Sequence, residues 1–345
     1  MTRTFVFLLL LIVCSYNVVG QTPRDTDDVN AKKAFNQAAK LIYSKDYKGA
    51  LIQLNKALSL KPDFIQALSE RGKIYLLQDK PSEAIVDFNK AILLNSSLGE
   101  AYFGRANALF QKKDYEKALQ DMTMAINNGY TEYIAYYYRG IINLMNSQAN
   151  AALLDFTLCI DKKNDFAEAY HDRGSSKLLL KDFQGATADY EKALELKPGF
   201  ALAYSNLGGL KKEMGDYKSA IENYSKSLKI DSTKADVWNK RGVAKYLAGD
   251  YSGAESDFDR ALKLNPQYSY SLNNQAIVNA KNEKQADALA KLDALIKANP
   301  QKGEYYLNRG YIKELSGDLN GACVDWKMAD TLNVKEAKLY LNDCK

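Results

Sequence analysis

The sequence predicts an all-α protein assembled from one repeated pair of helices, and three observations lead to this class. A small residue recurs every 34 positions along the chain. Each period holds two stretches in which apolar residues recur every three or four positions, the spacing of amphipathic helices. The 345 residues also include 6 prolines and 20 glycines, too few for the many turns of an all-β protein.

Two rows of small residues define the repeat. The first row is Ala38, Gly72, Ala106, Gly140, Gly174, Gly208, Gly242, Ala276 and Gly310. An alanine follows twelve residues later in every case, from Ala50 to Ala322. No insertion interrupts the spacing, which gives nine repeats: 31–64, 65–98, 99–132, 133–166, 167–200, 201–234, 235–268, 269–302 and 303–336. We number the places within a repeat from 1 to 34, so the two rows are places 8 and 20.

Repeat seven, residues 235–268, shows how each helix is expected to form. Trp238 and Gly242, four residues apart, mark one face of the first helix. Gly249 supplies the turn to the second helix, which Pro266 ends. Small residues at places 8 and 20 let the two backbones approach closely. A larger side chain there would force them apart, at a typical cost of about 1–3 kcal/mol.

Large side chains occupy two further places. Place 4 is aromatic at Tyr102, Tyr136, Tyr170, Tyr204 and Trp238, and place 24 is aromatic at Phe88, Phe156, Tyr190, Tyr224, Phe258 and Trp326. With alanine common at place 27 and proline near place 32, this pattern resembles the tetratricopeptide repeat family. The chain departs from the family at place 7, where arginine mostly replaces leucine, and at place 27 in Cys159, Ser227 and Leu295.

The resemblance covers residues 31–336 and implies a right-handed superhelical solenoid of nine helix–turn–helix units. It also implies that the first helices line a concave groove, which in this family commonly binds peptides or other proteins. Residues 21–30 are polar and predict a flexible lead-in. Residues 337–345 resemble the start of a further first helix and predict a short helix that caps the last apolar face.

Residues 1–20 predict a secretory signal peptide. Arg3 precedes an unbroken apolar run over residues 5–14, and Val18 and Gly20 are the small residues expected before a cleavage site. The run is shorter than the roughly 20 apolar residues that a membrane-spanning helix needs. We therefore expect an exported protein of the periplasm or the extracellular space, without a membrane span after cleavage.

Two cysteines near the end of the chain are candidates for a disulfide. Cys323 is at place 21, which is otherwise mostly leucine or isoleucine, and Cys344 falls at place 8 of the capping segment. Both would face inward at the same end, either bridged or as two small buried side chains. Cys159, at place 27, is expected to be a free buried thiol.

No motif of a catalytic, cofactor or metal site is present. The sequence lacks a phosphate-binding glycine-rich loop, HExxH and CxxC, and His171 is its single histidine, which we expect at the surface. The net charge of +5 is spread along the chain rather than concentrated in a basic face. We therefore expect no enzyme activity, no cofactor and no metal, and no nucleic acid or small-molecule substrate.

The places that face the groove by family analogy suggest two kinds of contact. In repeats three and four they carry the apolar residues Phe103, Tyr137, Tyr138, Ile141 and Met145. Further along they carry Asn206, Asn239, Asn274 and Asn308. We expect the first set to anchor a partner segment and the asparagines to bind its backbone. The alternatives are packing between neighbouring first helices for the aromatic residues and ordinary polar surface for the asparagines.

One pattern predicts a contact inside the repeats. Arginine at place 7 and aspartate at place 23 occur in the same six repeats: Arg71 and Asp87, Arg105 and Asp121, Arg139 and Asp155, Arg173 and Asp189, Arg241 and Asp257, Arg309 and Asp325. The other three repeats lack both residues. Because places 8 and 20 lie level in an antiparallel pair, places 7 and 23 are close, and we expect an ion pair between the two helices.

The sequence thus predicts a non-catalytic protein–protein interaction scaffold of the cell envelope or exterior, which binds a protein or extended peptide in its concave groove. A structural subunit of an envelope assembly, using its convex face or its ends, is the alternative.

Overall fold

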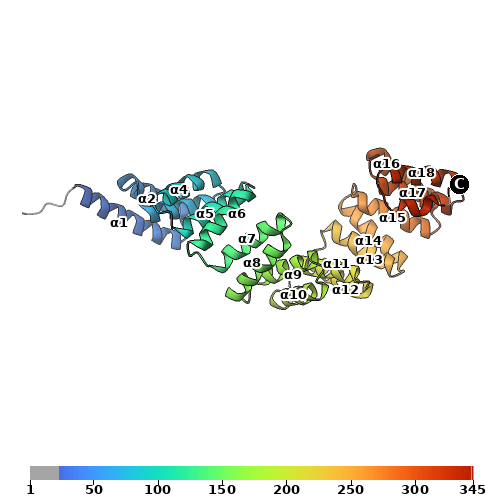
Figure 1. Cartoon of the computed structure of the whole chain (residues 1–345), viewed down its shortest axis with the longest axis horizontal. Coiled ribbons are helices and arrows are strands. Elements are labelled where there is room, and N and C mark those ends of the chain that lie inside the picture. The colour runs from blue at the N-terminus through green and yellow to red at the C-terminus, as the bar shows by residue number, and fades with distance from the viewer. Residues whose placement is uncertain (1–22, 343, 345) are drawn as a thin grey trace, which may run out of the picture. The chain divides into compact units, whose positions relative to one another are not determined.

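The computed structural model describes residues 23–342 and 344 (Figure 1). Those residues form α-helices and no strand, which confirms the all-α class. The predicted signal peptide, residues 1–20, lies outside the described residues. The helices are α1 (Pro23–Tyr43), α2 (Tyr47–Leu60), α3 (Ile65–Leu77), α4 (Pro81–Leu94), α5 (Gly99–Gln111), α6 (Tyr115–Asn127), α7 (Tyr133–Met145), α8 (Ala149–Lys162), α9 (Ala167–Leu179), α10 (Phe183–Leu196), α11 (Ala201–Glu213), α12 (Tyr217–Ile230), α13 (Ala235–Leu247), α14 (Tyr251–Leu264), α15 (Ser269–Lys281), α16 (Gln285–Ala298), α17 (Gly303–Leu315), α18 (Leu319–Thr331) and α19 (Ala337–Leu341).

The helices pack as consecutive pairs, the arrangement of a tetratricopeptide solenoid. Each odd-numbered helix from α1 to α17 is the first helix of a repeat and packs on the second helix that follows it. First helices of neighbouring repeats also touch, as α9 does with α11 and α11 with α13. The chain divides into two compact units, one ending at Thr131 and the other beginning at Glu132, which are described separately below.

The turn between the two helices of a repeat has a conserved backbone form. Place 15 has a positive φ in every repeat, and three repeats carry glycine there, at Gly215, Gly249 and Gly317. The next residue is an aspartate N-cap in six second helices, and its carboxylate accepts a hydrogen bond from the backbone N–H three residues on. This local chemistry starts the second helix at the same place of each repeat.

The close approach of the two helices depends on a pair of places. Place 8 is glycine wherever place 24 is aromatic, and alanine wherever place 24 is aliphatic, as in Ala38 with Leu54, Ala106 with Met122 and Ala276 with Leu292. A Cβ at Gly242 would lie 2.6 Å from the Phe258 ring, closer than carbon atoms approach. The place-24 ring therefore lies against the first-helix backbone and fixes glycine at place 8.

The N-terminal end corrects one expectation. The structure begins α1 at Pro23, so residues 23–30 are helical rather than a flexible lead-in. Proline is favoured at the first position of a helix because its missing N–H would be unpaired there. Asp28 on this extension pairs with Lys61 after α2, at 3.1 Å.

The C-terminal end is closed by a short helix. α19 covers Ala337–Leu341, and its Tyr340 ring stacks on Trp326 at 5.0 Å between centroids. Cys323 on α18 and Cys344 form a disulfide, with their Cα atoms 5.6 Å apart. Cys159 is a free, fully buried thiol, and burial raises its pKa to about 12.

Candidate functional site

Ion pairs hold the two helices of six repeats together, as the sequence predicted. Nε and Nη2 of each arginine donate to the two carboxylate oxygens over 2.5–3.1 Å: Arg71 to Asp87, Arg105 to Asp121, Arg139 to Asp155, Arg173 to Asp189, Arg241 to Asp257 and Arg309 to Asp325. These aspartates are at most 5% exposed. A buried carboxylate needs such partners, so the pairs stabilise the packing of the two helices.

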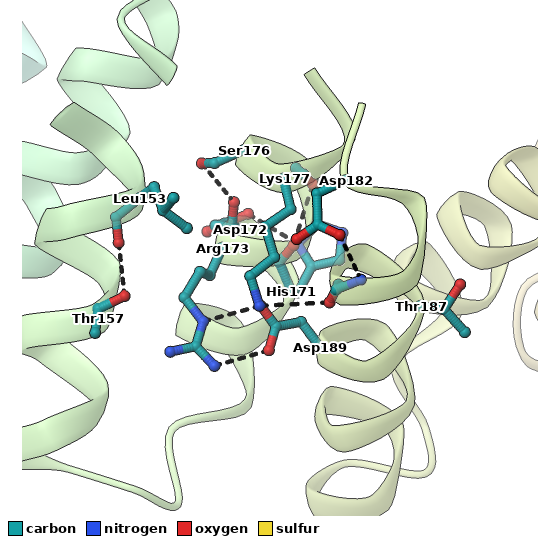
Figure 2. A network of polar contacts seen from close by, with 12 residues as sticks. Leu153, Thr157, His171, Asp172, Arg173, Ser176, Lys177, Asp182, Thr187 and Asp189 are labelled. Atoms are coloured by element: carbon teal, nitrogen blue, oxygen red, sulfur yellow. Dashed lines mark hydrogen bonds and ion pairs between the residues drawn. The ribbon is translucent and has the colours of Figure 1, made fainter. Parts of the chain in front are cut away.

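The structure adds further members to these pairs. Lys177 at place 11 binds the same Asp189 carboxylate as Arg173, at 2.8 Å, and Figure 2 shows both cations of α9 directed at this residue of α10. Lys245 and Lys313 repeat the contact with their own aspartates at 3.0 and 2.9 Å. The hydrogen bond to Asp189 raises the pKa of Arg173, against the opposing effect of burial.

Some of the arginines also connect neighbouring repeats. Their Nη1 atoms donate over 2.7–3.0 Å to place 25 of the preceding repeat: Arg71 to Asn55, Arg105 to Asn89, Arg241 to Ser225 and Arg309 to Asp293. We call an arginine with its aspartate and these added partners a clamp. A clamp of this kind holds the two helices of a repeat together and also links them to the preceding repeat.

A second row of hydrogen bonds runs along the first helices of the second unit. A place-5 residue pairs with the place-6 residue of the following repeat, 35 residues on, and we call each such pair a rung. The rungs are Tyr137 with Asp172 at 2.8 Å, His171 with Asn206 at 2.8 Å, Asn239 with Asn274 at 3.0 Å and Asn273 with Asn308 at 2.9 Å.

His171 lies at the centre of this row. It is 4% exposed, so the surface position expected from the sequence is wrong. Its Nδ1 pairs with Asp172 at 2.8 Å, and its Nε2 with the amide nitrogen of Asn206 at 2.8 Å. Both ring nitrogens therefore have partners within the protein.

The predicted aromatic anchors are engaged within the protein. Tyr137 donates its hydroxyl to Asp172, and its ring lies 4.8 Å from that of Phe166. Burial, followed by the Asp172 charge, raises the pKa of Tyr137. Phe103 belongs to the first unit, where it stacks on Tyr130 at 4.5 Å. The contact of Tyr137 with Asp172 joins the neighbouring first helices α7 and α9, whereas Tyr130 lies in the loop between α6 and α7.

The remaining predicted residues differ in exposure. Tyr138 and Ile141 on α7 are half-buried, and Met145 is 50% exposed. Each of the four asparagines belongs to a rung, and Asn206, Asn274 and Asn308 are half-buried. Asn239, for example, is 8% exposed and accepts hydrogen bonds from both Asn274 and Ser271. The spacing of 35 residues between rung partners was the signal in the sequence that could have revealed this.

No rung forms where place 5 is serine, at Ser69 in the first unit and at Ser205 in the second. The Oγ atoms of Ser69 and Ser205 are buried and have no hydrogen-bond partner among the described residues. The place-6 residues that would reach them are Gly104, which has no side chain, and Lys240, which pairs with Asp236 at 3.1 Å instead. Leaving a buried hydroxyl unpaired costs about 1–3 kcal/mol.

A pocket of about 620 Å³ opens at Ser205 between α9, α11 and α13. Its lining includes Leu178, Tyr190, Asn206, Gly209, Leu210, Tyr224 and Leu247, with Lys212, Glu213 and Lys240 also lining it. The Tyr224 ring is 1% exposed, and burial raises its pKa to about 12. Gly209 contributes no side chain, which leaves the pocket open. A smaller pocket of about 240 Å³ lies at Ser69 in the first unit.

The described residues hold neither a membrane-spanning helix nor a cluster of metal ligands. None of their helices has the length and apolar character needed to cross a bilayer. In the same part of the chain, no three histidine, cysteine, aspartate or glutamate side chains gather in a way that could hold a metal ion.

Known families match four segments of the chain. Residues 71–130, 167–200 and 235–268 match profiles described as tetratricopeptide repeat, and residues 210–249 match one described as TPR repeat. No match was found among curated proteins.

Solved structures of bacterial proteins share the fold. A tetratricopeptide repeat protein from Parabacteroides merdae is 19% identical with a TM-score of 0.58, covering 72% of this chain and 98% of its own. The C-terminal part of a TPR repeat-containing protein from Cytophaga hutchinsonii is 20% identical with a TM-score of 0.55, covering 69% and 99%. PilF of Pseudomonas aeruginosa is 18% identical with a TM-score of 0.53, covering 61% and 96%. The matched segments and the helix-pair packing together support placing this chain in the tetratricopeptide repeat family.

Proposed function

We propose that the protein is a non-catalytic interaction scaffold that binds an extended segment of a partner protein on the first-helix face of its second unit. Tetratricopeptide repeat proteins generally mediate protein–protein interactions. The observation that carries the proposal is the pocket at Ser205. A rung is missing there, and the buried hydroxyl has no partner.

The bound segment supplies the missing rung. A backbone carbonyl of the partner accepts from the Ser205 hydroxyl, as the Asp172 carboxylate accepts from the Tyr137 hydroxyl. Because the free protein already bears the cost of an unpaired hydroxyl, this bond should be worth more than one formed at a solvated group. Binding through the partner's backbone gives affinity with little dependence on its sequence.

The lining of the pocket indicates which side chain enters it. Leu178, Leu210 and Leu247 present aliphatic surface, and Tyr190 and Tyr224 are 0% and 1% exposed. An aliphatic or aromatic side chain of the partner would bury its surface here without leaving a charge unpaired. This places the main contact at repeats five to seven, beyond the aromatic residues of repeats three and four that the sequence favoured.

We also propose that the protein works in the periplasm or outside the cell. The predicted signal peptide supports export, and the Cys323–Cys344 bridge suits an oxidising compartment. The alternative role, a structural subunit of an envelope assembly, would use the second helices or the ends of the array and would not need the pocket.

The test uses two glycine variants of the full mature chain. Gly209→Leu places a side chain in the pocket, and its Cβ would meet only the Tyr224 hydroxyl at an ordinary 3.5 Å. Gly199→Leu is the matched control, since nothing lies within 4 Å of its Cβ position. The wild-type chain serves as bait in the envelope fraction, and the affinity of each variant for the captured partner is then measured.

We expect Gly209→Leu to weaken binding at least tenfold at an unchanged melting temperature, and Gly199→Leu to bind as the wild type. Ser205→Ala should weaken binding several-fold without loss of stability, because it removes a hydroxyl that has no partner in the free protein. Full affinity of Gly209→Leu would reject the pocket and favour the role in an envelope assembly.

A further inference from the structure

Repeat eight, residues 269–302, differs from its neighbours where its two helices meet. Place 4 is Leu272, whereas repeats three to seven and repeat nine carry tyrosine or tryptophan. Place 26 is Ala294, where repeats six and seven have Lys226 and Arg260. Both residues of the clamp are also replaced, by Gln275 at place 7 and by lysine at place 23. The amide of Gln275 instead donates to Asp259 of the preceding repeat.

Repeat seven shows what normally occupies this space. The Trp238 indole lies between two cations, with the guanidinium carbon of Arg241 at 4.7 Å and that of Arg260 at 5.9 Å from its centroid. Only a small cavity of about 230 Å³ remains beside the ring, lined by Trp238, Ser256, Asp259, Arg260 and Lys263. The place-4 ring and its covering cations therefore fill most of the space between the helices.

In repeat eight the corresponding space is open. A cavity of about 750 Å³ shares places 4, 22 and 26 with the cavity of repeat seven, and these places are Leu272, Ala290 and Ala294 here. Its deeper walls are Leu295, 6% exposed, and Tyr305 of the next repeat, 8% exposed. This volume is within the range of about 300–1,000 Å³ typical of ligand sites.

We propose that this cavity binds an aromatic side chain presented by a partner polypeptide, at a site separate from the pocket at Ser205. The cavity has the position of a ring that the neighbouring repeats supply from their own place 4. Places 7 and 26, which carry the two cations near Trp238 in repeat seven, are Gln275 and Ala294 here, and the charged side chains in the lining are Asp287 and Lys291. An uncharged ring fits against the apolar part of this lining, Leu272, Ala290 and Ala294.

The rim favours tryptophan or tyrosine over phenylalanine. Ser269, Asn299 and Gln267 line the opening and offer hydrogen-bonding groups to an indole N–H or a phenol O–H. Tyrosine and tryptophan are suited to sites with an apolar interior and a wet edge. The site uses α15, α16 and α17, whereas the pocket at Ser205 uses α9, α11 and α13, so the two sites can be tested independently.

The experiment titrates the mature chain with N-acetyl-tryptophanamide, a neutral probe with one aromatic side chain, and follows the alanine methyl signals by NMR. We expect saturable shifts at Ala290 and Ala294. Leu272→Tyr restores the ring of the other repeats and should weaken binding at least tenfold. Ala294→Leu fills the opening and should do the same, which keeps the test valid if the first variant fails to fold.

Two controls define the outcome. Ala286→Leu makes the same change on an exposed part of α16 outside the cavity and should bind as the wild type. Gly209→Leu should also leave the probe affinity unchanged, which separates this site from the proposed peptide pocket. Absence of saturable shifts, or equal affinity of Ala294→Leu and Ala286→Leu, would overturn the proposal. N-acetyl-leucinamide is the aliphatic control, and an affinity equal to or tighter than that of the tryptophan probe would overturn the proposal as well.

Discussion

Repeats seven and eight are adjacent, equally long and built from helices with the same boundaries within the repeat, yet they are held together differently. Repeat seven has the clamp of Arg241, Asp257 and Lys245, and the Phe258 ring against Gly242. Repeat eight has none of these contacts. Its Asn279, at the place of Lys245, keeps a buried side-chain oxygen without a partner among the described residues.

The difference separates what the repeat needs from what it can vary. Small residues at places 8 and 20 and the turn at place 15 occur in both repeats, and both fold as helix pairs. The clamp and the place-4 ring are therefore additions that fill and fix the space between helices. Where repeat eight omits them, it leaves the cavity beside Leu272 and the unpaired oxygen of Asn279, whereas the pocket at Ser205 follows from a missing rung.

The largest effect is expected from removing the anion of the clamp in repeat seven. Asp257→Leu leaves the partly buried Arg241 and Lys245 side by side without their shared counter-charge, which should cost about 3 kcal/mol. Hydrogen exchange at the amides of α13 and α14 measures this local stability.

A triple variant tests whether the three residues of this clamp act together. Arg241→Gln, Lys245→Asn and Asp257→Lys together copy the residues of repeat eight and should cost less than Asp257→Leu alone. Equal losses in the single and triple variants would show that the members of the clamp do not act as a unit.

The disulfide allows the local stability of repeat eight to be compared with that of the end of the second unit. Closing the loop between Cys323 and Cys344, separated by 21 residues, should contribute about 3 kcal/mol in the chain-entropy model. Replacing both cysteines with serine should speed hydrogen exchange in α18 more than in α16. Thiol counting on the denatured, unreduced mature chain should find Cys159 alone, whereas three free thiols would exclude the bridge.

The pairing of glycine with an aromatic ring can be tested by giving repeat seven the residues that repeat eight has at places 8 and 24. Gly242→Ala should cost about 1–3 kcal/mol, because the added methyl meets the Phe258 ring at 2.6 Å. Adding Phe258→Leu produces the combination of repeat eight, Ala276 with Leu292, and should recover part of that loss. A double-mutant cycle measures the coupling. Strict additivity of the two changes would contradict the steric explanation.

The smallest effect is expected in repeat four, where place 11 is Asn143 instead of the lysine found in repeat seven. Burial raises the pKa of Asp155, and hydrogen bonds from Arg139 and Asn143 oppose this only in part. Asn143→Lys supplies the cation that repeat seven has, and should add about 1 kcal/mol at pH 7. Asn150→Lys, exposed on α8, is the control for added charge.

The pH dependence of this variant has a defined sign. In the wild type the folded pKa of Asp155 is above its unfolded value, so the carboxyl favours folding when protonated and this contribution is lost as the pH rises through the folded pKa. The added lysine acts on the charged form only. The gain from Asn143→Lys should therefore be present at pH 7 and disappear as the pH falls below about 4. A gain that is the same at both pH values would exclude an electrostatic origin.

Contacts within a repeat could be predicted from the sequence because their geometry is fixed locally. Two helices joined by a short turn bring places 7 and 23 together in every repeat, so the shared presence of arginine and aspartate was enough to predict six ion pairs. The pairing of place 8 with place 24 is visible in the sequence in the same way. A helix from Pro23 was missed because a polar segment carries no apolar periodicity, although one face of it still reaches Lys61.

Contacts between repeats were decided by the tertiary structure. Their partners come from different turns of the array, and their distances depend on the offset at which neighbouring first helices stack. The asparagines could be identified as one row from the sequence, but not their pairing over 35 residues, nor the serine at place 5 that interrupts it. The two pockets exist for the same reason. Each is a space that side chains from two or three repeats fail to fill, and no single repeat determines it.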